Sequence, residues 1–199
     1  MKILIKSLFL MGIIFFISTM IGMAQEQTTD SAKSFFTSAN TNNIDKEAHL
    51  LYKEARRLQS EGNYKEAIEC HNKAINMNPR FEDAYYDRGR AYSKLRQYEQ
   101  AIKDFTDLLN IDSHYIGSYC ERGKAYIELG KYDEAIADFN KSLKNMPNNS
   151  EVYYYRGNAY RGKKDKESAK KDWEKAVSID KTGDFGRMAQ DELDDLNNE

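Results

Sequence analysis

The chain has 199 residues, a formal net charge of −2 and a pI near 6.0, which argues against a protein that coats nucleic acid, since such proteins are basic overall. Its 40% hydrophobic and 12% aromatic residues give too much apolar surface for a wholly disordered chain. Only 2 Pro and 11 Gly leave few turn residues for an all-β sandwich or barrel, so the composition favours helices.

Residues 1–24 are predicted to be a signal peptide rather than part of the fold. Two lysines make a short basic start, and residues 7–24 carry no charge. Gly22 and Ala24 place small residues at the −3 and −1 positions of a signal-peptidase site. The alternative is an uncleaved membrane anchor, because the uncharged run from residue 7 to residue 24 is long enough for a spanning helix. We expect cleavage, and with it an exported, periplasmic or secreted protein. The richness in Lys, Asn, Ile and Tyr indicates a bacterial gene.

Residues 25–44 are polar and have little periodicity, and they are predicted to be a flexible leader. Their apolar feature is Phe35-Phe36, which either docks on the first helix or lies in a loose segment; we expect the loose segment. The repeat domain described next is expected to occupy residues 45–199.

From residue 45 onward the chain repeats itself at a fixed spacing. Glycine, tyrosine and alanine recur at this spacing, at Gly89, Gly123 and Gly157, at Tyr92, Tyr126 and Tyr160, and at Ala67, Ala101, Ala135 and Ala169. A constant period of this length is typical of a solenoid built from stacked repeats. The predicted units are 48–81, 82–115, 116–149 and 150–183.

Each unit contains two helical patterns, and the third unit shows them most clearly. Tyr119, Gly123 and Tyr126 fall at helical spacing, followed by a break at Gly130. A second apolar stripe then runs to Pro147, through Ala135, Ile136, Phe139, Leu143 and Met146. The small residues at fixed positions allow two helix backbones to approach closely. The pattern predicts an all-α solenoid of helix–turn–helix units.

Residues 184–199 are predicted to form a capping helix after the fourth unit. Its apolar face is made by Phe185, Met188, Ala189, Leu193 and Leu196, and its opposite face carries Asp191, Glu192, Asp194 and Asp195. Terminal repeats need a polar outer cover of this kind. A separate acidic interaction tail is the alternative, but the apolar stripe favours docking on the last repeat.

These units resemble those of the tetratricopeptide repeat family. The family pattern is a large apolar residue, Leu-Gly and Tyr, then Ala, Phe, Ala and Pro, and the third unit carries Tyr119, Gly123, Tyr126, Ala135, Phe139 and Pro147. The first unit departs from it with Ala55 for Gly and His71 for the aromatic residue, and the turn positions hold Arg96 in the second unit and Lys163-Lys164-Asp165 in the fourth. The resemblance implies four tetratricopeptide repeats plus a C-terminal capping helix.

The sequence carries no motif typical of an enzyme. A Gly-rich phosphate loop, Cys-x-x-Cys, His-Glu-x-x-His and a nucleophile elbow are absent from it. Cys70 and Cys120 lie in different units, so we expect two free thiols, since a disulfide needs Cα atoms within ~7 Å. We therefore expect a non-enzymatic protein with no cofactor and no metal.

In the family, the first helices of successive units line a concave groove. The fifth residues of the units are Tyr52, Tyr86, Cys120 and Tyr154, and the ninth residues are Arg56, Arg90, Lys124 and Asn158. Equal positions in stacked units point the same way, so the two rows would run side by side along the groove. Cations next to tyrosines suit an extended or acidic protein segment. The predicted groove residues are Tyr52, Arg56, Tyr86, Arg90, Lys124, Tyr154 and Asn158.

Family members that bind chaperone tails use a carboxylate clamp, and this chain lacks it. The clamp positions hold Tyr52 and Arg56, then Asp87, then Gly117 and Glu121. Two function classes stay open: a binding module that presents its groove to a protein segment in the envelope, and a structural subunit of an envelope assembly that uses its convex face or its ends. RNA binding is less favoured because the chain is acidic. Neither nucleic acid nor stable membrane insertion of the mature chain is expected.

Arginine and aspartate recur together in the last three units. Arg88, Arg122 and Arg156 precede the repeat glycine, and Asp104, Asp138 and Asp172 follow them at one fixed spacing, on the second helical pattern. The first unit has Glu54 and Cys70 in these places. Joint presence and joint absence suggest a contact, either across the helix pair or to the neighbouring repeat. The alternative is two independent solvated faces.

Overall fold

The computed structural model describes residues 43–198, and the regular secondary structure in this range is helical throughout. The predicted signal peptide, residues 1–24, and nearly all of the predicted leader, residues 25–44, lie outside the described residues. Residues 43 and 44 are helical, so the helix begins before the predicted start of the repeat domain. The chain divides into two units, Met1–Glu47 and Ala48–Glu199, and the second unit contains the repeats.

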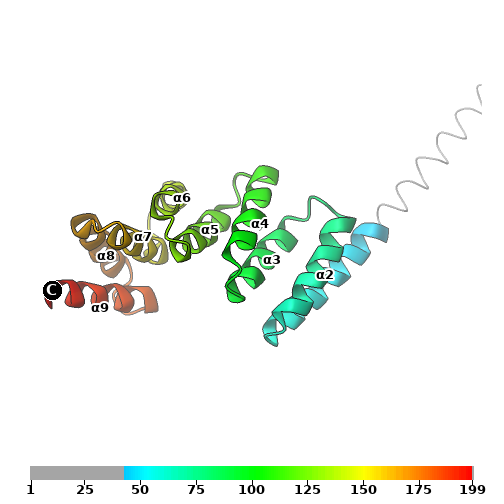
Figure 1. Ribbon diagram of the computed structural model, residues 1–199, viewed down its shortest axis with the longest axis horizontal. Helices are drawn as coiled ribbons and strands as arrows, with labels where there is room; N and C mark the ends of the chain where they lie inside the picture. Colours follow the sequence, from blue (N-terminus) through cyan, green and yellow to red (C-terminus); the bar gives the residue numbers. More distant parts are fainter. Residues whose placement is uncertain (1–42, 199) are drawn as a thin grey trace, which may run out of the picture. The chain divides into compact units, whose positions relative to one another are not determined.

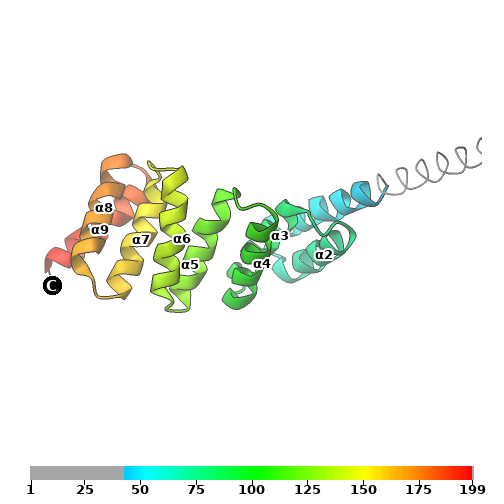
Figure 2. The same cartoon turned by 90° about the horizontal axis from the view of Figure 1, so that it is seen from above.

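Within the second unit, residues 48–60 are helical, and the helices that follow are α2 (Tyr64–Met77), α3 (Glu82–Lys94), α4 (Tyr98–Ile111), α5 (Ile116–Glu128), α6 (Tyr132–Asn145), α7 (Ser150–Gly162), α8 (Lys166–Ile179) and α9 (Asp184–Asn198). From α2 onward each helix packs against the helices next to it in sequence (Figures 1 and 2). The pairs α3–α4, α5–α6 and α7–α8 each occupy one predicted unit, and α9 covers α8 and α7. The predicted all-α solenoid with a C-terminal capping helix is thereby confirmed.

The first helices of neighbouring repeats lie closer together than the second helices do. Helix α3 contacts α5, α5 contacts α7, and α7 contacts α9. Among the labelled helices, α2, α4, α6 and α8 make no comparable contact with one another. A stack of helix pairs bends toward the layer that is more closely spaced, so the first helices form the concave side of the second unit.

The turn inside each repeat contains one residue with a positive φ angle. Gly62 and Gly130 have φ angles of 82° and 69°, and Arg96 and Lys164 have φ angles of 58° and 64°. These four positions are one repeat period apart, so all four repeats use the same left-handed turn. The unusual turn sequence of the fourth repeat therefore keeps the backbone geometry of the others and places a lysine in a conformation that favours glycine.

Replacing this lysine with glycine is expected to stabilise the fold. A non-glycine residue in the left-handed region costs about 1–2 kcal/mol, and the greater entropy of glycine in the unfolded chain offsets part of the gain. Lys164→Gly should raise the free energy of unfolding by about 0.5–1 kcal/mol in urea titrations followed by circular dichroism. The reverse change at an equivalent turn, Gly130→Lys, should lower it by a similar amount. Equal stability of the two variants would contradict the argument.

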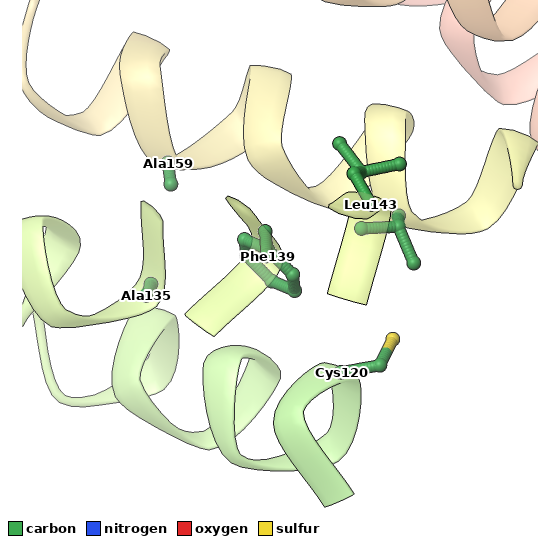
Figure 3. Close-up of a cluster of buried hydrophobic side chains, with 6 residues drawn as sticks. Cys120, Ala135, Phe139, Leu143 and Ala159 are labelled. Carbon is green, nitrogen blue, oxygen red and sulfur yellow. The ribbon is translucent and has the colours of Figure 1, made fainter. Parts of the chain in front are cut away.

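The core of each later repeat is built around a glycine and a large aromatic residue. Phe105, Phe139 and Trp173 on the second helices are fully buried. A Cβ atom added to Gly123 would lie 2.7 Å from Cε1 of Phe139, and the equivalent distance for Gly89 and Phe105 is 2.8 Å. Figure 3 shows Phe139 between α5 and α7, with Ala135 and Ala159 both on the left of the ring in this view. The glycine is therefore required by the close approach of the ring to the first helix.

Gly123→Ala should consequently destabilise the protein by about 1–3 kcal/mol, because the new methyl group forces a fully buried ring out of its position. The matched control is Gly117→Ala on the same helix. Its new Cβ would lie 3.4 Å from the Tyr86 hydroxyl, an ordinary contact, so we expect stability equal to or above that of the unmodified protein. Chemical denaturation of both variants measures the difference. A Gly123→Ala variant as stable as Gly117→Ala would show that the helix pair adapts to the extra methyl group.

The predicted pairing of arginine and aspartate is confirmed in all three later repeats. Arg122 donates from Nε to Asp138 Oδ2 at 2.7 Å and from Nη2 to Asp138 Oδ1 at 2.8 Å. Its remaining terminal nitrogen, Nη1, donates to Thr106 Oγ1 of the preceding repeat at 2.9 Å. The other repeats have the same arrangement with Arg88, Asp104 and Asn72, and with Arg156, Asp172 and Asn140. Each arginine therefore ties its own helix pair to the repeat before it.

Candidate functional site

Two neighbouring hollows lie along the first helices of the repeats. The smaller one, about 240 Å³, is called the Arg56 hollow and is lined by Arg56, Gln59, Ser60, Tyr64, Asp87, Arg90, Ala91 and Lys94. The larger one, about 370 Å³, is called the Tyr155 hollow and is lined by Arg90, Ser93, Lys94, Tyr98, Glu121, Lys124, Ala125, Ile127, Glu128, Tyr155 and Asn158. Arg90 and Lys94 belong to both linings, so the two hollows are adjacent parts of one surface.

All four of the ninth residues, three cations and one asparagine, line these hollows. Arg56, Arg90, Lys124 and Asn158 stand at the same position of successive repeats, and the structure brings them to the surface of the first helices. Asn158 also has a structural contact, because its Oδ1 accepts a hydrogen bond of 3.0 Å from Trp173 Nε1. The even spacing of this row in the sequence therefore does correspond to a row in space.

The charges in the row differ in how strongly they are neutralised. The Arg56 side chain is 65% exposed, and its Nε lies 3.7 Å from Asp87 Oδ2. The Arg90 side chain is exposed and lies over the Tyr86 ring, 5.8 Å from its centroid. The Lys124 side chain is only 25% exposed, and its Nζ lies 2.7 Å from Glu121 Oε1 and 3.0 Å from Glu151 Oε1. Arg56 and Arg90 thus remain available to a partner, whereas Lys124 is already paired.

The electrostatics around Lys124 and Asp87 follow from burial and from these contacts. Burial alone would lower the pKa of the Lys124 ammonium, but the Glu121 and Glu151 carboxylates outweigh it and raise that pKa. For Asp87, burial raises the pKa of the carboxyl group, although the Tyr52 hydroxyl donates to its Oδ2 at 3.0 Å. Lys124 is therefore a firmly charged, ion-paired residue, and Asp87 is held in place by its tyrosine.

The predicted tyrosine row lies behind the hollows rather than in them. Tyr52 and Tyr86 are half-buried, and neither lines a hollow; Tyr86 packs against Phe105 and Tyr115 with ring centroids 5.9 and 5.2 Å apart. Tyr154 is only 7% exposed and packs in the core that contains Trp173. The predicted place of Tyr154 in the groove is therefore corrected, because its side chain is buried. The fifth residue of a repeat faces the partner helix and the following repeat, which cover it.

Several lining residues were not predicted from the sequence. Tyr155 and Ile127 supply the apolar part of the Tyr155 hollow, and Lys94 supplies a third exposed cation. They stand at the sixth, twelfth and thirteenth positions of their repeats, where the other repeats carry different residue types. A search for residue types that recur at the repeat period therefore misses them. Mapping every position of the first helix onto one wheel would have placed them on the same face.

Another hollow, about 610 Å³, lies at the end of the stack between α8 and α9. Val177, Met188 and a mixture of charges line it, with Lys181 and Arg187 opposed by Asp184 and Asp191. Because its charges alternate, this hollow offers no preference for one kind of charged ligand. Within residues 43–198, no group of three or more His, Cys, Asp or Glu side chains could hold a metal ion.

Both cysteines are free thiols and lie in different repeats. Cys70 is half-buried on α2, whereas Cys120 is buried on α5, where burial raises the pKa of its thiol to about 12. A buried thiol with a raised pKa is a poor nucleophile. Among the described helices, none is long and apolar enough to cross a membrane.

Two family models match the repeats. The model described as TPR repeat matches residues 55–96 and 123–164, and the model described as tetratricopeptide repeat matches residues 82–115 and 150–182. Together these ranges cover more than half of the 199 residues. The comparison with curated proteins gives no match.

Solved structures with the same fold include MamA from Desulfovibrio magneticus RS-1, with a TM-score of 0.71 and 20% identity over 76% of this chain and 84% of that one. A tetratricopeptide repeat protein from Parabacteroides merdae has a TM-score of 0.66 and 20% identity over 77% of this chain and 61% of that one. The first TPR domain of Spaghetti, bound to the HSP90 peptide SRMEEVD, has a TM-score of 0.58 and 26% identity over 59% of this chain and 93% of that one.

The model matches follow the same period as the helix pairs, the left-handed turns and the glycine–aromatic cores. Domains of this type in general mediate protein–protein interaction and are not enzymes. The chain is therefore a member of the tetratricopeptide repeat family.

Proposed function

We propose that the chain is a non-enzymatic scaffold of the cell envelope that binds an extended protein segment along the first helices of its repeats. The observation that carries this proposal is the pair of adjacent hollows on the concave side, lined in part by exposed cations. A domain with the same fold, the first TPR domain of Spaghetti, is bound to an HSP90 peptide, which supports a protein segment as the ligand. The contacts of this chain differ from a chaperone-tail clamp, because the clamp positions hold other residue types.

Arg90 and Lys94 are the best residues for testing this proposal. Both are exposed, both line the two hollows, and neither forms an ion pair among the described residues, so charge reversal should leave the fold intact. Arg90→Glu/Lys94→Glu is expected to abolish capture of partner proteins from an envelope extract without changing helix content. Capture should also weaken with added salt, since exposed charges are screened within ~10 Å at 0.1 M.

The matched control reverses two exposed lysines on the outer layer, Lys170→Glu/Lys171→Glu on α8. It changes the net charge by the same amount at a distance from the hollows, and we expect normal capture. Loss of capture by this control, together with normal capture by the Arg90→Glu/Lys94→Glu variant, would indicate that the partner binds the convex face and not the groove. The protein would then be better described as a structural subunit of an envelope assembly.

The envelope location is proposed from the uncharged segment of residues 7–24 and the small residues Gly22 and Ala24. Export would place the groove outside the cytoplasm, where cytosolic chaperone tails are absent. N-terminal sequencing of the protein recovered from the envelope should begin at Gln25. A chain that keeps Met1 and stays with the membrane fraction would indicate an anchored protein instead.

A further inference from the structure

The positive charge available to a ligand is concentrated in the Arg56 hollow. Its lining contains three cations, Arg56, Arg90 and Lys94, against one carboxylate, Asp87. The Asp87 side chain is 13% exposed and already accepts the hydrogen bond from Tyr52, so it neutralises its surroundings only in part. An acidic side chain entering this hollow would meet exposed arginine forks, which match the geometry of a carboxylate.

The Tyr155 hollow has a different chemistry. Three of its charged residues make contacts within the protein, because Lys124 is paired with Glu121 and Glu151, and Glu128 accepts a hydrogen bond of 2.9 Å from the Tyr98 hydroxyl. The other two, Arg90 and Lys94, form the border that this hollow shares with the Arg56 hollow. What the Tyr155 hollow adds for a ligand is the apolar surface of Ala125 and Ile127 and the Tyr155 ring. The cationic surface therefore borders an apolar one.

This apolar surface occurs in one place along the groove. The position of Ile127 is taken by Gln59, Ser93 and Arg161 in the other repeats. The position of Tyr155 is taken by Lys53, Asp87 and Glu121. Ile127 and Tyr155 come from neighbouring repeats and line the same hollow. Within residues 43–198, these two positions are therefore both apolar at one site, with a cationic site beside it.

The spacing of the helices gives the separation of the two sites. The first helices of neighbouring repeats are in contact, and helices in contact have axes about 8–10 Å apart. An extended chain advances about 3.3 Å per residue. The Arg56 hollow is lined by the first and second repeats, whereas Ile127 and Tyr155 belong to the third and fourth, so the two sites are one to two repeat spacings apart. They would therefore be about three to six residues apart along a bound segment.

We infer that the groove recognises a protein segment with two anchors: an acidic side chain in the Arg56 hollow and a large apolar side chain, about three to six residues away, in the Tyr155 hollow. This inference rests on the proposed function and makes it specific. It also assigns Lys124 to the structure of the groove rather than to the ligand, although Lys124 belongs to the same sequence row as Arg56 and Arg90.

Selection of random dodecapeptides on the purified chain tests the inference, with binding of the selected peptides measured by fluorescence anisotropy. The selected peptides should share an Asp or Glu about three to six residues from a Leu, Ile, Phe, Tyr or Trp. Replacing either anchor in the peptide, the acid by its amide or the apolar residue by Ala, should weaken binding at least tenfold.

Variants of the chain identify which hollow holds which anchor. Arg56→Gln and Lys94→Gln should remove the preference for the acid over its amide, and Ile127→Gln, which copies the residue of the first repeat, should remove the preference for the apolar residue. Lys170→Gln on α8, an exposed residue outside both hollows, should retain both preferences.

The outcomes separate the inference from the proposed function. Selected peptides that lose binding to the Arg90→Glu/Lys94→Glu chain but show no acid–apolar pattern would overturn the two-anchor inference and leave the groove as the binding site. A preference for the acid that survives both Arg56→Gln and Lys94→Gln would also overturn it. Peptides that bind equally well to the charge-reversed chain would overturn the proposed function together with the inference.

Discussion

Asp138→Ala is expected to destabilise the protein by about 3–5 kcal/mol, a large part of the total stability of a domain of this size. The Arg122 and Asp138 side chains are only 12% and 5% exposed, and two hydrogen bonds of 2.7 and 2.8 Å join them. Without the carboxylate, the guanidinium remains buried with only the Thr106 hydroxyl and aromatic rings around it. An uncompensated buried charge is the costly species, more than the loss of the pair itself.

The same helix supplies a matched control for this prediction. Asp133 on α6 is also ion-paired, with Lys163, but its side chain is 78% exposed and that of its partner is 41% exposed. Asp133→Ala should change stability by less than about 1 kcal/mol, because exposed ion pairs are screened and hydrated. Urea titrations at pH 7 compare the two variants. Equal effects of Asp133→Ala and Asp138→Ala would contradict the assignment of Arg122 and Asp138 as a buried, stabilising contact.

A second variant tests whether the loss of stability comes from the unpaired charge that is left behind or from the loss of the ion pair itself. Replacing both partners, as in Arg122→Met/Asp138→Leu, removes the buried charges together and should be less destabilising than Asp138→Ala alone. The hydrogen bond to Thr106 tests the link between repeats, and Thr106→Val should lower stability by about 0.5–1.5 kcal/mol. A double variant that is no more stable than Asp138→Ala would mean that the charges themselves stabilise the helix pair.

The sequence predicted the arginine–aspartate contacts because both residue types recur together and are absent together from the first repeat. It did not reveal the third partner, although Asn72, Thr106 and Asn140 also stand one repeat period apart. Asn and Thr share no charge or shape that a search for recurring residue types would notice. What they share is an acceptor oxygen at the right place, and this becomes visible only once neighbouring repeats are stacked.

The groove shows the same division between what periodicity predicts and what it misses. A repeat period fixes which residues share a direction, so the row of Arg56, Arg90 and Lys124 could be predicted. It does not fix how deep a position lies, and Tyr154 is covered because Phe185 of the capping helix packs on it, with ring centroids 6.0 Å apart. Nor does the period show that Lys124 is neutralised by two carboxylates, Glu121 of its own repeat and Glu151 of the next repeat. Burial and pairing depend on the residues opposite, which vary from repeat to repeat.

The core of the first repeat contains a histidine where the other repeats have an aromatic ring of Phe or Trp. The stability of this repeat is therefore expected to depend on pH. His71 takes the place of Phe105, Phe139 and Trp173, and Ala55 takes the place of the glycine that faces them. His71 is fully buried, and among the described residues neither of its ring nitrogens has a hydrogen-bond partner. Burial, with a smaller contribution from the charge of Arg88, lowers the pKa of His71 from 6.5 to about 4.

Stability is therefore expected to fall as the pH decreases from about 6.5 to about 4. Well above pH 6.5 the imidazole is neutral in both the folded and the unfolded chain, and His71 contributes no pH dependence. Below 6.5 the unfolded chain takes up a proton that the folded chain does not accept until the pH nears 4. Each unit of pKa difference corresponds to about 1.36 kcal/mol, so the loss is of the order of 3 kcal/mol when the pH reaches 4.

A variant that restores the core of the other repeats isolates this effect from the titration of the carboxylates. The ring of Phe105 would lie within 2.8 Å of a Cβ atom on Gly89, so a phenyl ring at residue 71 also requires glycine at residue 55. The stability of Ala55→Gly/His71→Phe relative to the unmodified chain should rise steadily between pH 6.5 and 4, because groups common to both chains cancel in the difference. A flat difference for the double variant would show that His71 finds a hydrogen-bond partner or solvent when it is protonated, and that the first repeat opens at this point.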